Sequence, residues 1–166
     1  MSEVVMNRVD DRLIHGQVIT GWLGLRNANA IWIVDDAVAT NPMMLDIFKF
    51  AAPANCKIEA FTIDAAAERL QKLTEGKERI LLITKVPKTF LRLMEKGCRP
   101  SDVNYGAMAH KAQSKNVASN CDLSPEEIAD TEALFKQGIR VWIQLVPFGG
   151  QKEVEWEKAR QKVGLK

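Results

Sequence analysis

Near its N-terminus the chain has a run of side chains suited to binding an anionic group, Arg8-Val9-Asp10-Asp11-Arg12-Leu13-Ile14-His15-Gly16-Gln17. The run follows the apolar residues 4–6 and precedes residues 18–23, whose apolar side chains recur with helical spacing. An imidazole, a guanidinium and two carboxylates therefore lie where a strand leads into a helix. In open α/β sheets this is where anions bind, because the helix start offers unpaired N–H groups and the positive end of its dipole.

Within this run, His15 and Arg12 have the side chains best suited to group transfer. Neutral imidazole is nucleophilic near pH 7 without a separate base, because its unperturbed pKa is about 6.5. Arg12 carries a planar guanidinium with five donors, whereas a lysine would be only a point charge. Asp10 or Asp11 would orient Arg12 or accept the second imidazole N–H. We favour Asp10 for this role because of its position in the run. We expect Asp11 to have an ordinary structural role.

The composition is that of a globular protein. The chain has 166 residues, of which 46% are hydrophobic and 27% charged. Its 23 basic and 21 acidic residues are scattered and give a net charge of +2, which argues against nucleic-acid binding. Cys56, Cys98 and Cys121 are widely spaced, so we expect reduced cysteines and neither disulfides nor a metal site. Without a signal-peptide pattern or an apolar run of ~20 residues, we expect a soluble cytoplasmic protein.

Apolar strand patterns alternate with helical patterns along the chain. Strands are predicted at 4–9, 30–34, 57–63, 79–84, 102–105, 116–118 and 139–146. Helices are predicted at 16–26, 42–52, 65–73, 87–94, 125–137 and 153–162, with Asp64 capping the third of them. The last helix is polar, and we expect it to pack loosely. This order predicts an α/β fold: a single doubly wound, mostly parallel sheet with helices on both faces, in one domain spanning residues 1–166.

The run from Arg8 to Val18 closely resembles the IIB components of the mannose/fructose/sorbose family of the bacterial sugar phosphotransferase system. It fits the pattern R-[IV]-D-[DE]-R-L-I-H-G-Q-V along its whole length. The similarity continues through Asp35-Asp36 and through residues 81–87, 103–108 and 138–147. This chain has Gly106-Ala107 where the family usually has Gly-Gly or Gly-Asn, and residues 108–113 and those after Phe148 also differ.

The resemblance implies a cytoplasmic phosphotransferase that acts as a relay. Such a subunit accepts a phosphoryl group from a histidine of the IIA component and passes it to a sugar carried by the membrane components IIC and IID. By the same resemblance, His15 is phosphorylated on its N(pi) nitrogen, and Arg12 and Asp10 belong to its loop. The expected partners are IIA, the IIC/IID permease subunits and the sugar, and association with the membrane is peripheral. A homodimer is compatible with the sequence.

The residue types of the loop suit this relay chemistry. A phosphohistidine keeps a high transfer potential, whereas a serine ester would be too stable to pass the group on. The transferring group is metaphosphate-like, so the protein mainly positions and neutralises it, as Arg12 would. Backbone N–H groups from Ile14, Gly16 and Gln17 would add a phosphate-binding nest, and Gly16 allows a close approach. The arrangement requires no metal ion and no other cofactor.

Three residues outside this loop are also candidates for its surroundings. Thr84 and Asp36 lie at predicted strand ends, where a hydroxyl or carboxylate would edge the same cleft. His110 follows another strand end and would contact phosphate or a partner; a surface position without chemistry is the alternative. For Thr84 the alternative is a residue at the edge of the core. Trp22 has helical spacing with its apolar neighbours and is expected in the core.

Two other functions are weighed against the relay. A receiver-type regulatory domain would be phosphorylated on aspartate, with Asp10 and Asp11 after one strand and Thr84 and Lys85 after another. The predicted strand at 59–63 offers no aspartate nucleophile for it. A non-catalytic module that binds phosphorylated proteins through Arg12 would never be labelled covalently. Phosphate labelling therefore separates all three functions.

Overall fold

The computed structural model describes residues 1–166, apart from the side chains of residues 17 and 18. The strands are β1 (Glu3–Val9), β2 (Ala30–Val34), β3 (Lys57–Phe61), β4 (Arg79–Thr84), β5 (Asp102–Tyr105), β6 (Lys115–Ala118), β7 (Cys121–Leu123), β8 (Arg140–Ile143) and β9 (Val154–Glu155). The helices are α1 (Gly16–Arg26), α2 (Asp36–Ala39), α3 (Pro42–Ala51), α4 (Ile63–Gln71), α5 (Lys88–Glu95), α6 (Pro125–Lys136), α7 (Trp156–Ala159) and the 3-10 helix η1 (Arg160–Val163).

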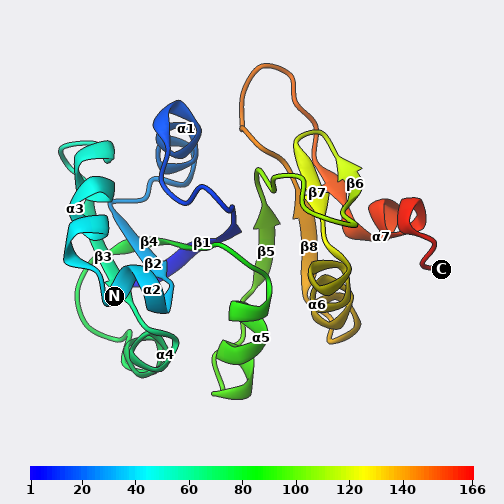
Figure 1. Ribbon diagram of the computed structural model, residues 1–166. Helices are drawn as coiled ribbons and strands as arrows, with labels where there is room; N and C mark the ends of the chain where they lie inside the picture. Colours follow the sequence, from blue (N-terminus) through cyan, green and yellow to red (C-terminus); the bar gives the residue numbers. More distant parts are fainter.

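Seven strands form one sheet in the order β3-β2-β4-β1-β5-β8-β9 (Figure 1). All neighbouring strands in it run parallel except β8 and β9. β6 and β7 form a separate antiparallel hairpin beyond β5. The predicted α/β class with a mostly parallel sheet is therefore confirmed. The strands β2 and β4 at its centre are buried along nearly their whole length, as continuous apolar sequence requires.

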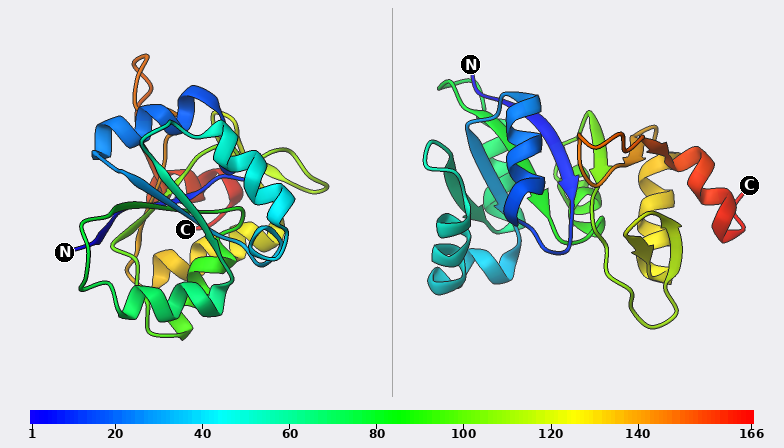
Figure 2. Two further views of the ribbon diagram at one scale, coloured as in Figure 1. Left: turned by 90° about the vertical axis from the view of Figure 1, so that its left-hand side faces the viewer. Right: turned by 90° about the horizontal axis from the view of Figure 1, so that it is seen from above.

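Helices cover both faces of the sheet, as the alternating pattern predicted (Figure 2). On one face, α1 and α3 pack on a cluster that includes Ile31, Ile33 and Leu81. Trp22 of α1 is only 1% exposed in this cluster, which confirms the expectation that it belongs to the core. On the opposite face, α4, α5 and α6 pack on a second and larger cluster.

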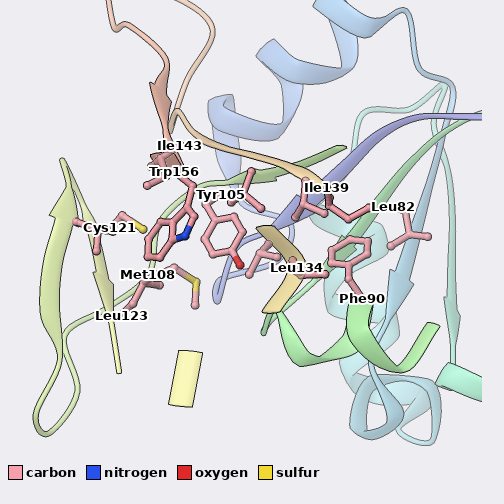
Figure 3. Packing of buried hydrophobic residues seen from close by; sticks show 14 of the residues in the cluster. Leu82, Phe90, Tyr105, Met108, Cys121, Leu123, Leu134, Ile139, Ile143 and Trp156 are labelled. Atoms are coloured by element: carbon pink, nitrogen blue, oxygen red, sulfur yellow. The ribbon is translucent and has the colours of Figure 1, made fainter. Parts of the chain in front are cut away.

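The larger cluster extends from α5 to the C-terminal segment (Figure 3). The cluster includes Phe90 from α5 and Leu134 from α6. Tyr105 lies between these two side chains and Trp156. The Tyr105 hydroxyl lies 2.7 Å from Thr131 Oγ1, so the one polar atom of this ring has a partner inside the core.

Most of the predicted helices start where the sequence signals place them, whereas α4 starts earlier and α2 was not predicted. Asn41 caps α3, and Ser124 and Glu127 form a complete capping box at α6. The predicted cap of Asp64 is wrong, because Thr62 accepts the Ala65 N–H and α4 begins at Ile63. Both residues have oxygens suited to capping, and the earlier one follows the strand end directly.

The C-terminal segment differs most from its prediction. β8 ends at Ile143, a short antiparallel strand β9 follows, and the predicted helix at 153–162 is a four-residue α-helix, α7, that continues into the 3-10 helix η1. It is also firmly packed, because Trp156 is fully buried and donates from its indole N–H to Glu132 at 2.9 Å. Arg160 forms an ion pair with the same carboxylate. The buried Trp156 side chain anchors this otherwise polar helix to the core. The periodicity of the sequence does not reveal such a single anchor.

No helix among the described residues is long and apolar enough to cross a membrane.

The burial of Trp156 predicts a large loss of stability on truncation. We expect Trp156→Ala to lower the free energy of unfolding by about 3–5 kcal/mol, because it leaves a cavity and removes one hydrogen bond to Glu132. Phe50→Ala is the matched control, since Phe50 is 91% exposed and should change stability by no more than about 0.5 kcal/mol. Urea unfolding followed by circular dichroism measures both. Equal midpoints for the two variants would contradict the anchoring role of Trp156.

Candidate active site

The candidate site lies at the edge of the sheet where the parallel strands β1, β5 and β8 end. The segment that leaves β1 enters α1 on one face, whereas the segment that leaves β5 leads to α6 on the other. Neighbouring strands whose connections diverge in this way open a crevice at their carboxyl ends. The loop from Asp10 to His15 begins at this crevice, as the sequence predicted.

A buried ion pair holds the start of this loop. Arg8 and Asp10 are both fully buried, and Arg8 Nη2 donates to Asp10 Oδ2 at 3.0 Å. Arg8 Nη1 donates to the Asn104 side-chain oxygen on β5, and Arg8 also donates to the carbonyls of Gln144 and Leu145 at 3.2 and 3.0 Å. One guanidinium thereby joins the ends of β1, β5 and β8.

The surroundings of Arg8 favour this one arrangement. Its guanidinium carbon lies 5.5 Å from the Trp22 ring centroid, and the Trp22 indole N–H donates to the Leu145 carbonyl at 2.9 Å. Burial lowers the pKa of Arg8 to about 10, and the nearby Asp10 carboxylate opposes that effect. Arg8 is therefore still charged near neutral pH.

Asp10 also fixes the turn that follows it. Its Oδ1 accepts the Arg12 backbone N–H at 3.0 Å, and its carbonyl accepts the Leu13 N–H at 3.0 Å. Leu13 has a φ of 56°, a left-handed conformation that costs a leucine about 1–2 kcal/mol. The cost is offset by packing, because Leu13 and Ile14 are buried in the cluster beneath α1. Hydrogen bonds at one end and apolar anchors at the other leave this loop little freedom.

His15 stands at the N-cap position of α1 with an extended backbone. Its side chain is partly buried; Nδ1 lies 3.4 Å from the Leu13 carbonyl oxygen, longer than a normal hydrogen bond, and Nε2 is buried without a partner among the described residues. The next residue, Gly16, has a φ of 43° and open space where a side chain would begin. An anion can therefore approach the backbone at the positive end of α1 closely.

Arg12 lies beside His15 in sequence and has its side chain 50% exposed. Its Nε is 4.0 Å from Asp10 Oδ1, so the carboxylate that fixes the turn also lies near its guanidinium. Arg12 lines a hollow of about 550 Å³ together with Asp11, His110 and the β6–β7 hairpin. Asp11 closes one side of it, because its Oδ2 accepts the Ala109 N–H at 2.6 Å. The structural role expected of Asp11 is the one observed.

Asp10 and Thr84 were also predicted as site residues, and both are buried. The hydrogen bonds of Asp10 reach Arg8 and backbone N–H groups of Arg12 and Ala107, rather than the imidazole of His15. The phosphate contact predicted for Thr84 is not supported, because its hydroxyl is buried and donates to Thr89 at 2.8 Å. A threonine at the end of a buried strand faces the core as readily as the edge.

Three predictions concern the first turn of α1 and the approach to α2. Ile14 is anchored in the core by its side chain, and its backbone contribution stays a prediction. Gln17 lies outside the described residues. Asp36 does not edge this crevice as predicted, since its Oδ1 accepts the Ile63 N–H at 2.9 Å and joins α2 to the start of α4.

Sequence reasoning missed the residues that position the loop: Arg8, Asn104 and Gly106. One signal was present, because Arg8 is a charged residue inside an apolar strand and lies two residues from Asp10, on the same side of the strand. Asn104 and Gly106 gave no comparable signal, since their role depends on strand order. Among the described residues, no group of three histidine, cysteine, aspartate or glutamate side chains lies close enough to hold a metal ion.

Comparison with known proteins defines the class: a phosphotransferase of the sugar phosphotransferase system. The family model for the PTS system sorbose subfamily IIB component matches residues 4–164, so the chain belongs to this family of IIB components. It is 32% identical over 151 residues to the N-acetylgalactosamine-specific phosphotransferase enzyme IIB component 1 of Escherichia coli, covering 90% of this chain and 94% of that one.

Two further comparisons concern the fold and a longer relative. The crystal structure of manxB from Thermoanaerobacter tengcongensis has a TM-score of 0.86 and 30% identity and covers 99% of both chains. The mannose-specific EIIAB component of Escherichia coli is 30% identical over 142 residues, which make up 84% of this chain and 43% of that protein. The resemblance found in the Arg8–Val18 run is thus confirmed over nearly the whole chain.

The close packing at Gly106 predicts that a single methyl group disturbs the site. A Cβ there would overlap Arg8 Nη2 and Asp10 Oδ2, both of which are buried. We expect Gly106→Ala to reduce the free energy of unfolding by about 1–3 kcal/mol. Gly24→Ala is the control, because a Cβ at this helical position meets nothing within 4 Å and should stabilise by about 0.5–1 kcal/mol. Thermal unfolding of both variants and the parent measures these changes in stability. A Gly106→Ala protein as stable as the parent would contradict the tight fit.

Proposed function

We propose that the whole chain, residues 1–166, acts as a single IIB domain that carries a phosphoryl group on His15. The observation that carries the proposal is the place of this residue: the N-cap of α1, directly before Gly16 and three residues after the half-exposed Arg12, on a loop that Asp10 fixes. The positive end of the helix stabilises a phosphate dianion. Arg12 would contact its oxygens during transfer and neutralise their charge.

The acceptor atom in this proposal is Nδ1, the N(pi) nitrogen. Nε2 is buried, so an incoming phosphoryl group would have to displace packed atoms to reach it. Nδ1 has only a long contact to the Leu13 carbonyl and gives up little when it forms a bond to phosphorus. In transfer, the donor N–P bond breaks with its electron pair staying on the donor imidazole. In the tautomer that carries its proton on Nε2, the lone pair of Nδ1 forms the new N–P bond, and no proton has to change place.

The proposed phosphoryl donor is a IIA component, and the proposed acceptor is a sugar at the membrane subunits IIC and IID. Family membership supports these partners, as does the mannose-specific relative whose name joins A and B components. With no membrane-crossing helix among the described residues, we place the protein in the cytoplasm, bound peripherally at IIC/IID. Sugar selectivity would then lie mainly in the membrane subunits.

The site argues against the two alternative functions. A receiver-type domain needs its acidic pair open to a magnesium ion, whereas Asp10 is fully buried and both of its oxygens accept hydrogen bonds. A module that only binds phosphoproteins through Arg12 would have no use for the strained Leu13, which helps to set the position of His15.

Phosphate labelling tests the proposal directly. The protein is mixed with phosphoenolpyruvate, the general phosphotransferase proteins and a IIA component, and analysed by mass spectrometry. We expect one added phosphate, acid-labile and alkali-stable, that is lost in His15→Ala. Nitrogen-15 NMR of the labelled ring should assign the phosphate to Nδ1. A label that survives His15→Ala, or no label at all, would refute the relay; a label on Nε2 would refute the choice of nitrogen.

The geometry of Arg12 predicts a strong effect on transfer rate with little effect on folding. We expect Arg12→Ala to slow single-turnover transfer from phosphorylated IIA by about 10²–10³-fold, the range typical of one transition-state donor. Arg12→Lys should recover part of the rate, because it restores charge without the planar fork. Arg26→Ala removes a guanidinium at the C-terminal end of α1, the opposite end from the loop, and serves as a control expected to transfer normally. Transfer by Arg12→Ala at the parental rate would exclude the proposed contact.

A further inference from the structure

His110 lines the same hollow as Arg12 and the β6–β7 hairpin. Its side chain is 72% exposed, yet Nδ1 lies 2.9 Å from Asp122 Oδ2 on β7. Because this contact uses Nδ1, Nε2 is the nitrogen left for a ligand. In its protonated form the ring donates from both nitrogens, to Asp122 and to whatever occupies the hollow.

The carboxylate that orients His110 is itself held in place. Asn116 on β6 donates from its side-chain nitrogen to Asp122 Oδ1 at 2.8 Å and to the Ala118 carbonyl at 2.8 Å. The hydrogen bond from Asn116, followed by that from His110, lowers the pKa of Asp122. The hairpin thus presents a charged, fixed acceptor to the imidazole. An exposed histidine without a function would not need two residues to fix its ring.

The same segment is tied to the predicted phosphoryl loop. The Asp11 carboxylate binds the Ala109 N–H, one residue before His110, and Arg12 and His110 line one hollow. The charged groups around it are Asp11 and Arg12 from the β1 loop and Asp122 from the hairpin. Asp11 and Asp122 are engaged by hydrogen bonds, so Arg12 and protonated His110 are the cationic groups that can meet an anion there.

We propose that His110, oriented by Asp122, is a second contact for the phosphoryl group, acting opposite Arg12. The inference rests on the proposed function of His15. While the group moves between the donor nitrogen and His15, His110 donates its Nε2–H to a non-bridging phosphoryl oxygen. It keeps this proton throughout and forms no bond to phosphorus, so the balance of the transfer step is unchanged.

Single-turnover transfer from phosphorylated IIA tests this role. One charge-assisted hydrogen bond is worth about 1.5–3 kcal/mol, so we expect His110→Ala to lower the maximal rate about 10- to 100-fold. The IIA concentration that gives half of this rate should change little. Asp122→Asn keeps an acceptor for Nδ1 but removes its charge, and should cause a smaller loss. Lys115→Ala removes a charge from the same hairpin outside the hollow and should transfer normally.

The outcomes separate this inference from the function on which it rests. A parental protein that takes no label at His15 overturns both. A labelled parent with an unchanged maximal rate in His110→Ala overturns the second contact alone. So does a higher half-saturating IIA concentration at an unchanged maximal rate, because His110 would then contact the partner protein rather than the phosphoryl group.

Discussion

The buried ion pair between Arg8 and Asp10 is the interaction on which the rest of the site depends. Removing two charges from water is costly, and hydrogen bonds to their donors and oxygens must offset most of that cost. The two terminal nitrogens of Arg8 donate to Asn104 and to two carbonyls after β8, and Asp10 accepts from the loop that leads to His15. Loss of either charge would leave the other uncompensated, at a cost of about 3–5 kcal/mol. The same network therefore supports the fold and positions the reactive loop.

This arrangement explains features that look unrelated along the chain. A glycine at position 106 is required because the backbone directly after β5 passes against the ion pair. Trp22 is buried under Arg8 and holds the Leu145 carbonyl that Arg8 also uses. Each of these residues stiffens the base of the crevice. Since the base is rigid, the reactive ring itself needs only weak contacts, and the 3.4 Å separation between His15 and the Leu13 carbonyl is consistent with that freedom.

The sequence predicted most of the fold because its strands and helix starts carry local signals. Continuous apolar strands such as Ala30–Val34 and caps such as Ser124 are read correctly from their own residues. The C-terminal segment was misjudged because Trp156 is buried by elements distant in sequence. The candidate site likewise combines local and distant signals. The motif alone locates His15 and Arg12. The contacts of Asn104 and Gly106 with the ion pair can be inferred only once β1 and β5 are known to pair. Thr84 was misplaced because strand ends do not reveal which way a side chain turns.

A relay protein must serve two partners in turn, and this requirement shapes how exposed its groups are. A closed pocket would bind the phosphoryl group well but would also hold it against the next acceptor. Here the charges that never move, Arg8 and Asp10, are buried, whereas Arg12 is half exposed and His110 largely so. Exposed cations bind an anion only weakly in water and more strongly when a docked partner excludes that water. In the proposed relay, the site would therefore gain its full strength only in a complex, and the phosphoryl group would be held loosely enough between complexes to be passed on.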